Sequence, residues 1–186
     1  MASDGGGEGL DSAELVPDRS CQGCTLCCKL LQVEPLSKPR GVWCRYCDQK
    51  RGCKSYETRP EACRTFYCGW RRIPALDDRW KPSQARLLVN YESAANRIVI
   101  HVDAGRPEAW RAKPFYPALK QWSRNAPVLV WCGGHLTIVL PDGERELGEV
   151  RDDQYIIPVE RPTAQGKRLD FDIVEADDPR AAPYRT

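Results

Sequence analysis

Nine of the ten cysteines in this chain lie between residues 21 and 68, and only Cys132 lies elsewhere. Several are spaced as C-x-x-C, in which a tight turn can direct two sulfur atoms at one ion, as in zinc ribbons. No histidine lies in this stretch, so we expect ligation by sulfur alone. The candidate metal ligands are Cys21, Cys24, Cys27, Cys28, Cys44, Cys47, Cys53, Cys63 and Cys68.

These cysteines are expected to stay reduced. The first eight residues are acidic and glycine-rich, with neither a basic segment nor an apolar run, so they do not resemble a secretory signal. No apolar run approaches the roughly 20 residues needed to span a bilayer. We therefore predict a cytoplasmic protein with no membrane segment, in a compartment that keeps thiols reduced. The adjacent Cys27 and Cys28 cannot readily form a disulfide with each other. We therefore expect one of them to serve a different metal site or to be a buried cysteine that binds no metal.

The spacing leaves the identity of the metal open. Paired C-x-x-C elements separated by a loop are typical of zinc sites, whereas C-x-x-C-x-x-C also opens the cysteine run of bacterial ferredoxins. Here the fourth cysteine follows the third at once instead of three residues later. Nine cysteines allow two four-ligand sites with one left over, or one cluster with the rest structural. We expect zinc or an iron–sulfur cluster, in one or two sites.

The whole motif resembles the YkgJ-type cysteine-cluster family, which is described as a zinc- or iron-chelating domain. The resemblance covers about residues 20–73. It rests on C-x-x-C-x-x-C-C, Trp-Cys-x-x-Cys, Gly-Cys and Tyr-x-x-Arg-Pro-x-x-Cys-Arg-x-Phe-x-Cys-x-Trp, carried by Cys21, Cys24, Cys27, Cys28, Trp43, Cys44, Cys47, Gly52, Cys53, Tyr56, Arg59, Pro60, Cys63, Arg64, Phe66, Cys68 and Trp70. The resemblance implies metal binding, and it leaves both the metal and the activity undefined.

The charge of the chain is unevenly distributed. The net charge is +2 overall, but it is −4 over residues 1–20, +7 over residues 21–81 and −1 over the remainder. A basic middle segment is compatible with nucleic-acid binding. A four-thiolate site carries a formal charge near −2, however, so two sites would neutralise about four of these positive charges. We prefer this second explanation, while nucleic acid and an unidentified protein partner both stay open.

Composition and apolar periodicity divide the chain into four parts. Residues 1–19 are expected to be a disordered lead, 20–81 a cysteine-cluster metal-binding unit, 82–160 a small antiparallel α+β unit and 161–186 a polar, extended C-terminal tail. Proline at position 60 predicts a helix from about Arg59 to Tyr67. The elements expected in the third part are strands at 86–91, 97–102, 128–132, 136–140, 144–150 and 154–159 and helices at 107–111 and 117–124.

The predicted fold class is α+β, with the cysteine-rich, metal-stapled unit packed on a small antiparallel β-sheet that has one or two helices. Gly133 and Gly134 separate two apolar runs and supply the positive φ that a tight hairpin turn needs. His101, His135 and Cys132 are expected to be ordinary strand or turn residues. No catalytic residue is identified, and no glycine-rich phosphate loop or nucleophile elbow occurs.

Three functions are compatible with these features. The first is a zinc or iron–sulfur protein with a structural, accessory or regulatory role, because the ligands are all cysteines and no catalytic constellation accompanies them. The second is an iron–sulfur redox or cluster-dependent enzyme subunit, so enzymatic activity is left open. The third is a nucleic-acid-binding zinc module, which would bind with a steep salt dependence.

Overall fold

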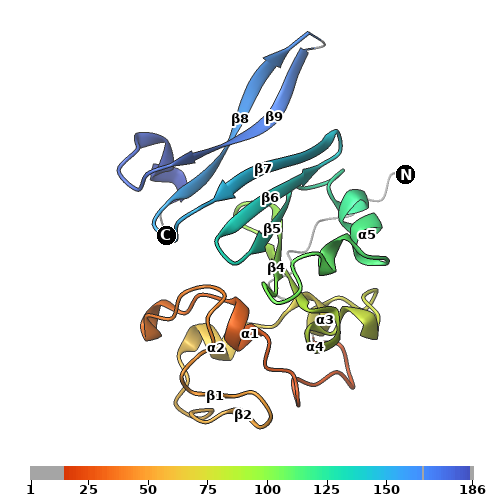
Figure 1. Ribbon diagram of the computed structural model, residues 1–186, viewed down its shortest axis with the longest axis vertical. Coiled ribbons are helices and arrows are strands. Elements are labelled where there is room, and N and C mark those ends of the chain that lie inside the picture. Colours follow the sequence, from red (N-terminus) through yellow and green to blue (C-terminus); the bar gives the residue numbers. More distant parts are fainter. Residues whose placement is uncertain (1–14, 165, 185–186) are drawn as a thin grey trace, which may run out of the picture.

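The computed structural model describes residues 15–164 and 166–184. Most of the predicted lead, residues 1–19, lies outside these ranges. The predicted α+β class is confirmed, because short helices alternate with three small sheets. The cysteine-rich segment lies at one end of the long axis, a five-stranded sheet in the middle and a β-hairpin at the other end (Figure 1).

The cysteine-rich segment consists of short elements joined by turns. These are α1 (Cys27–Leu30), η2 (Glu34–Leu36), β1 (Cys47–Asp48), β2 (Gly52–Cys53), α2 (Glu61–Thr65), α3 (Gly69–Arg72), η3 (Asp78–Trp80) and α4 (Pro82–Ala85). Pro60 caps α2, which is shorter than predicted because Phe66 is already extended (φ −74°, ψ 124°). Cys68 lies beyond the end of α2, as expected, and caps α3.

The central sheet has the order β3-β4-β5-β6-β7. Its strands are β3 (Leu87–Glu92), β4 (Arg97–Val102), β5 (Val128–Cys132), β6 (His135–Leu140) and β7 (Gly143–Glu149). Neighbours are antiparallel except β4 and β5, which are parallel, so the expectation of a purely antiparallel sheet is corrected. A parallel pair needs a long crossover, and here the crossover carries η4 (Ala109–Arg111) and α5 (Phe115–Trp122).

The β5–β6 hairpin forms as predicted. Gly133 and Gly134 make the turn, and Gly133 has a φ of +61°, a conformation that glycine adopts without steric cost. His135 is the first residue of β6, where it pairs with Cys132 and is exposed. His101 lies in β4 and is buried.

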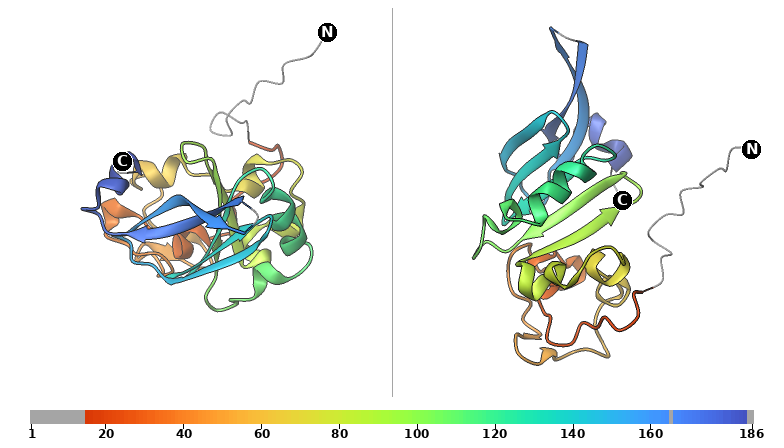
Figure 2. Two further views of the ribbon diagram at one scale, coloured as in Figure 1. Left: turned by 90° about the horizontal axis from the view of Figure 1, so that it is seen from above. Right: turned by 90° about the vertical axis from the view of Figure 1, so that its right-hand side faces the viewer.

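The central sheet is buried on both faces, and alternate residues of each strand face opposite ways. One face, the α5 face, packs against α5 and against Leu26, Leu30 and Trp70 of the cysteine-rich segment. The other face, the hairpin face, packs against Ile156 and Phe171. The turned views show α5 lying along the sheet (Figure 2). The strand residues of the α5 face include Leu87, Val89, Ile98, Ile100, Val102, Val128, Val130 and Val139, and those of the hairpin face include Val99, Leu129, Trp131, Leu136, Ile138 and Leu140.

The C-terminal part differs from the extended tail that was predicted for residues 161–186. There β8 (Tyr155–Thr163) pairs with β9 (Gly166–Val174), and η5 (Pro179–Tyr184) follows. Much of β9 is exposed, and its sequence is therefore polar and resembles that of an extended tail. Its charges are paired across the two strands, as between Arg161 and Asp170 (3.2 Å) and between Lys167 and Glu160 (2.7 Å). Such cross-strand ion pairs stabilise a hairpin that has little core of its own.

The helices are all short. The longest α-helix in the described ranges, α5, has eight residues. Among the described residues, none of the helices combines the length and the apolar character needed to cross a bilayer.

Candidate metal centre

The C-x-x-C pairs form the tight turns that their spacing predicts. The Cys24 N–H donates to the Cys21 carbonyl (3.0 Å), and the Cys47 N–H donates to the Cys44 carbonyl (2.9 Å). The Cys44 N–H also donates to the Cys28 carbonyl (2.9 Å), which ties the second pair to α1. This last bond brings cysteines from two separate parts of the motif near one another.

Six thiols form the larger of two groups, which we call the six-thiol group. Cys47 lies opposite Cys53 in the β1–β2 pair. The Cys28 thiol shares hydrogen bonds with the thiols of Cys27 and Cys47. The Cys63 thiol is close enough to Cys28 and Cys53 to interact with their charges. The members of the six-thiol group are Cys27, Cys28, Cys44, Cys47, Cys53 and Cys63.

The pKa values in this group reflect burial and mutual repulsion. The hydrogen bond with Cys27, followed by burial, raises the pKa of the Cys28 thiol strongly. Burial and the neighbouring Cys28 raise the pKa of Cys47 to about 12. Burial, with the charges of Cys28 and Cys44, also raises the pKa of Cys63. These three thiols therefore hold their protons at neutral pH until a cation is present to stabilise their charge.

The remaining three candidates form a smaller, three-thiol group of Cys21, Cys24 and Cys68. Cys68 interacts with the charges of both other members. Its burial against the core raises its pKa to about 11. The pKa of Cys21 is also raised by burial, although the nearby Arg71 opposes the shift. Cys63 and Cys68, neighbours in the motif, thus belong to different groups.

A buried lysine that sequence reasoning missed lies beside the six-thiol group. Lys38 is 6% exposed, and its ammonium donates to the carbonyls of Lys29 (3.0 Å), Leu31 and Pro39 (2.9 Å). Burial lowers its pKa, and the charges of Cys44 and Cys28, among others in the group, oppose that shift. The carbonyls at the end of α1 thus hold a positive charge next to the sulfurs, where it favours thiolates.

The donor chemistry fits zinc or an iron–sulfur cluster. All ten cysteines are free thiols, and nine of them fall into the two groups. Cys132 lies apart, at the end of β5. In residues 15–164 and 166–184, however, no set of three or more Cys, His, Asp or Glu side chains has the arrangement of a metal-ion site. Ligation would require the thiols to lose their protons and the sulfur atoms to converge further.

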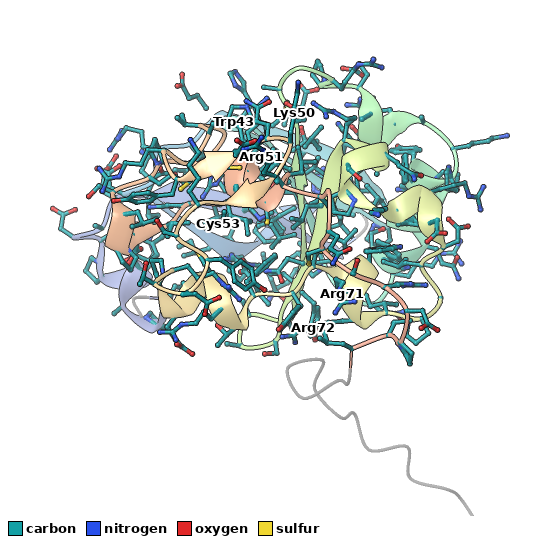
Figure 3. The ribbon with its side chains drawn as sticks, turned by 90° about the horizontal axis from the view of Figure 1, so that it is seen from below. Trp43, Lys50, Arg51, Cys53, Arg71 and Arg72 are labelled. Carbon is teal, nitrogen blue, oxygen red and sulfur yellow. The ribbon has the colours of Figure 1, made fainter. Side chains whose placement is uncertain are left out.

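The aromatic residues of the motif are arranged around these groups unequally. Trp70 is buried in the core shared with the sheet, whereas Tyr56 is 59% exposed. Arg71 and Arg72 each lie about 6 Å from the ring of Tyr67. Figure 3 views this end of the molecule from below, with Cys53, Arg71 and Arg72 labelled. The burial of Trp70 and the exposure of Tyr56 thus show that these aromatic side chains do not form one common shield.

Comparison with family models, with curated proteins and with solved structures found no match to this chain. The resemblance to the YkgJ-type family therefore rests on the cysteine motif itself.

Proposed function

We propose that the cysteine-rich segment binds zinc or an iron–sulfur cluster, as its resemblance to the YkgJ-type family implies. We propose that the metal-bound protein has a structural, accessory or regulatory role. The observation that carries the proposal is the six-thiol group. Two short helices, one tight turn and two paired strands, in a chain whose cysteines are all free, bring these sulfurs near one another. Crowded thiols repel one another once ionised, and a thiophilic cation removes that penalty.

The division into six and three thiols supports one principal site. The six-thiol group has more sulfurs than one tetrahedral zinc or one four-iron cluster needs. The three-thiol group contains too few for a closed four-cysteine site. We therefore assign the principal site to the six-thiol group, with Cys28 as a ligand because it contacts two other members.

The basic charges of the segment favour this function over nucleic-acid binding. Lys38 is directed inward and donates to the backbone carbonyls of Lys29, Leu31 and Pro39. The Arg40 guanidinium lies over the Trp131 ring, 3.8 Å from its centroid. These cations are used within the fold, so the positive charge of residues 21–81 overstates the charge that a phosphate backbone would meet.

The proposal is tested by metal content and an absorption spectrum of protein purified without oxygen. Zinc alone, without colour, would support a structural or regulatory metal. Iron with acid-labile sulfide and a broad band at about 400 nm would support a cluster and favour the redox or enzyme-subunit alternative. Protein that retains neither metal after reconstitution with each would overturn the proposal.

The choice of ligands is tested with matched serine variants. Cys28→Ser should lose most of the metal, because it removes the thiol that contacts two others. Cys132→Ser is the control, because Cys132 lies in the sheet outside both groups. Equal metal content in the two variants would exclude Cys28 as a required ligand.

A further inference from the structure

A second candidate site lies within the cysteine-rich segment, between α1 and α4. It is a hollow of about 390 Å³. Its polar and aromatic lining comes from three separated stretches of the chain and comprises Thr25, Lys29, Trp43, Gln49, Ser83 and Arg86. A concave site with a few converging polar groups is the usual form of a small-molecule site.

Two cations in this hollow are held by one buried carboxylate. The Lys29 ammonium donates to Oδ1 of Asp103 (2.6 Å), and the Arg86 guanidinium donates to Oδ2. The Asp103 side chain is 0% exposed, whereas the side chains of Lys29 and Arg86 are 19% and 40% exposed. Within the described residues, the lining of the hollow includes both cations and not the carboxylate. An entering molecule therefore meets positive charge.

The backbone around Asp103 holds this arrangement in place. The Asp103 N–H donates to the Arg86 carbonyl (2.9 Å), and the Gly105 N–H donates to the Asp103 carboxylate (3.0 Å). Arg86 ends α4 with a φ of +57°, a left-handed conformation that is unfavourable for a residue with a Cβ. Strain of this kind persists where the surrounding structure requires one placement of a residue. Here it accompanies an arginine that forms part of the hollow.

The charged groups at the hollow leave one positive charge unbalanced, which an anionic ligand would neutralise. Lys29 and Arg86 together carry two positive charges, against the single negative charge of Asp103. Both side chains have N–H donors beyond those directed at Asp103. The guanidinium fork suits the paired oxygens of a carboxylate or a phosphate. The Trp43 ring lies beside Lys29, 5.8 Å from its ammonium, and offers an apolar surface next to the charged end.

We propose that this hollow binds a small-molecule oxyanion, either a carboxylate or a phosphate monoester, with Lys29 and Arg86 at its charged end and Trp43 against its apolar part. Thr25 and Ser83 supply neutral hydrogen-bonding groups. The inference does not depend on the identity of the metal. Because Thr25 and Lys29 flank Cys27 and Cys28, a bound anion would lie close to the thiol groups.

The test is calorimetric titration of the purified full chain with phenyl phosphate, benzoate and benzyl alcohol at constant ionic strength. The two anions share an aromatic ring with the neutral alcohol, so the charge requirement is isolated. Binding of an anion without binding of the alcohol supports the proposal. A preference for phenyl phosphate indicates a phosphate monoester, and a preference for benzoate indicates a carboxylate. Absence of binding by both anions at millimolar concentration would overturn the proposal.

Variants locate the binding. Arg86→Gln should weaken it by about tenfold or more, the usual effect of losing a charge-assisted contact. Trp43→Leu leaves both ion pairs intact and should also weaken it, which keeps the test available if Arg86→Gln does not fold. Arg79→Gln is the control, because Arg79 lies in η3, pairs with Asp77 and does not line the hollow. Affinity unchanged in both Arg86→Gln and Trp43→Leu would place the anion elsewhere and refute the site.

Discussion

The guanidinium of Arg40 lies over the ring of Trp131, 3.8 Å from its centroid. Arg40 belongs to the loop after η2 in the cysteine-rich segment, and Trp131 belongs to β5 of the central sheet. The same guanidinium is 3.5 Å from the carboxylate of Asp152, in the turn before β8. One side chain thus links three parts of the chain that are far apart in sequence.

Replacing Arg40 should destabilise the fold. We expect Arg40→Ala to lower the free energy of unfolding by about 1–2 kcal/mol, because a largely desolvated cation–π contact and its ion pair are lost. Arg40→Lys keeps the charge but loses the planar stacking, so it should recover only part of this loss. Urea unfolding measures both effects. Arg45→Ala is a matched control, because Arg45 and the Tyr46 ring beneath it are both exposed. An equal effect of Arg40→Ala and Arg45→Ala would contradict the prediction.

The buried His101 should make the protein less stable in mild acid. Burial, with the charges of Arg40 and Lys38, lowers the pKa of His101 to about 3. In the unfolded chain its pKa is about 6.5, so between these values the unfolded state binds the proton and is favoured. The contribution is complete above about pH 6.5 and is lost progressively as the pH falls, with a loss on the order of 2 kcal/mol by pH 5.

The measurement for His101 is the free energy of unfolding at pH 7 and at pH 5. His101→Leu removes the titrating group and should decrease the difference between the two pH values, whatever its own effect on stability at pH 7. If the variant and the parent protein lose the same stability between pH 7 and pH 5, His101 does not cause the acid sensitivity.

The contact between α3 and β3 requires a glycine. A Cβ at position 69 would lie 3.0 Å from the Cβ and Cγ1 of Val89. Gly69→Ala should therefore destabilise the protein by about 1–3 kcal/mol, as overpacking of a core does. Val89→Ala in the same chain removes the Cγ1 contact but keeps the Cβ contact, so it should relieve part of the clash, and a double-mutant cycle would show the coupling. Gly134→Ala, whose Cβ would find ordinary contacts of 3.5 Å or more, should cost less.

Metal binding should release protons. The pKa of Cys28 is raised strongly by its hydrogen bond with Cys27 and by burial, and that of Cys47 is raised to about 12, so both thiols are protonated at pH 7. A metal binds thiolates, which must give up their protons on binding. The calorimetric heat of metal binding should therefore change with the ionisation enthalpy of the buffer, and the affinity should fall as the pH is lowered. A heat that is the same in all buffers would show that the thiols are already ionised.

Much of the central sheet could be predicted from the sequence, because most of its strands are short apolar runs and a pair of glycines marks the β5–β6 turn. The direction of the β4–β5 pair was harder to predict. Apolar runs do not show whether neighbouring strands are parallel or antiparallel. That direction depends on the connection between the strands, which here is the long crossover through α5. The C-terminal β9 was missed for a different reason. Only a few of its residues, such as Phe171 and Val174, are buried, and charged pairs stabilise the rest.

The candidate site could be predicted as a list of cysteines, and their division into two groups could not. Cys63 and Cys68 are close in sequence, but the extended Phe66 separates α2 from α3 and directs the two thiols to different groups. The buried charges were missed as well. Lys38 and Asp103 have ordinary local sequences, and only the fold brings them to the thiols and to the paired cations.

The two-sided burial of the sheet has a consequence for biosynthesis. Phe171 completes the hairpin face, yet it follows the last strand of the sheet by more than twenty residues. A nascent chain that has left the ribosome only as far as β7 would therefore present Leu129 and Ile138 to solvent or to a chaperone, on a sheet whose α5 face is already covered. We expect the tendency to aggregate during synthesis to fall once β9 emerges and Phe171 covers that surface.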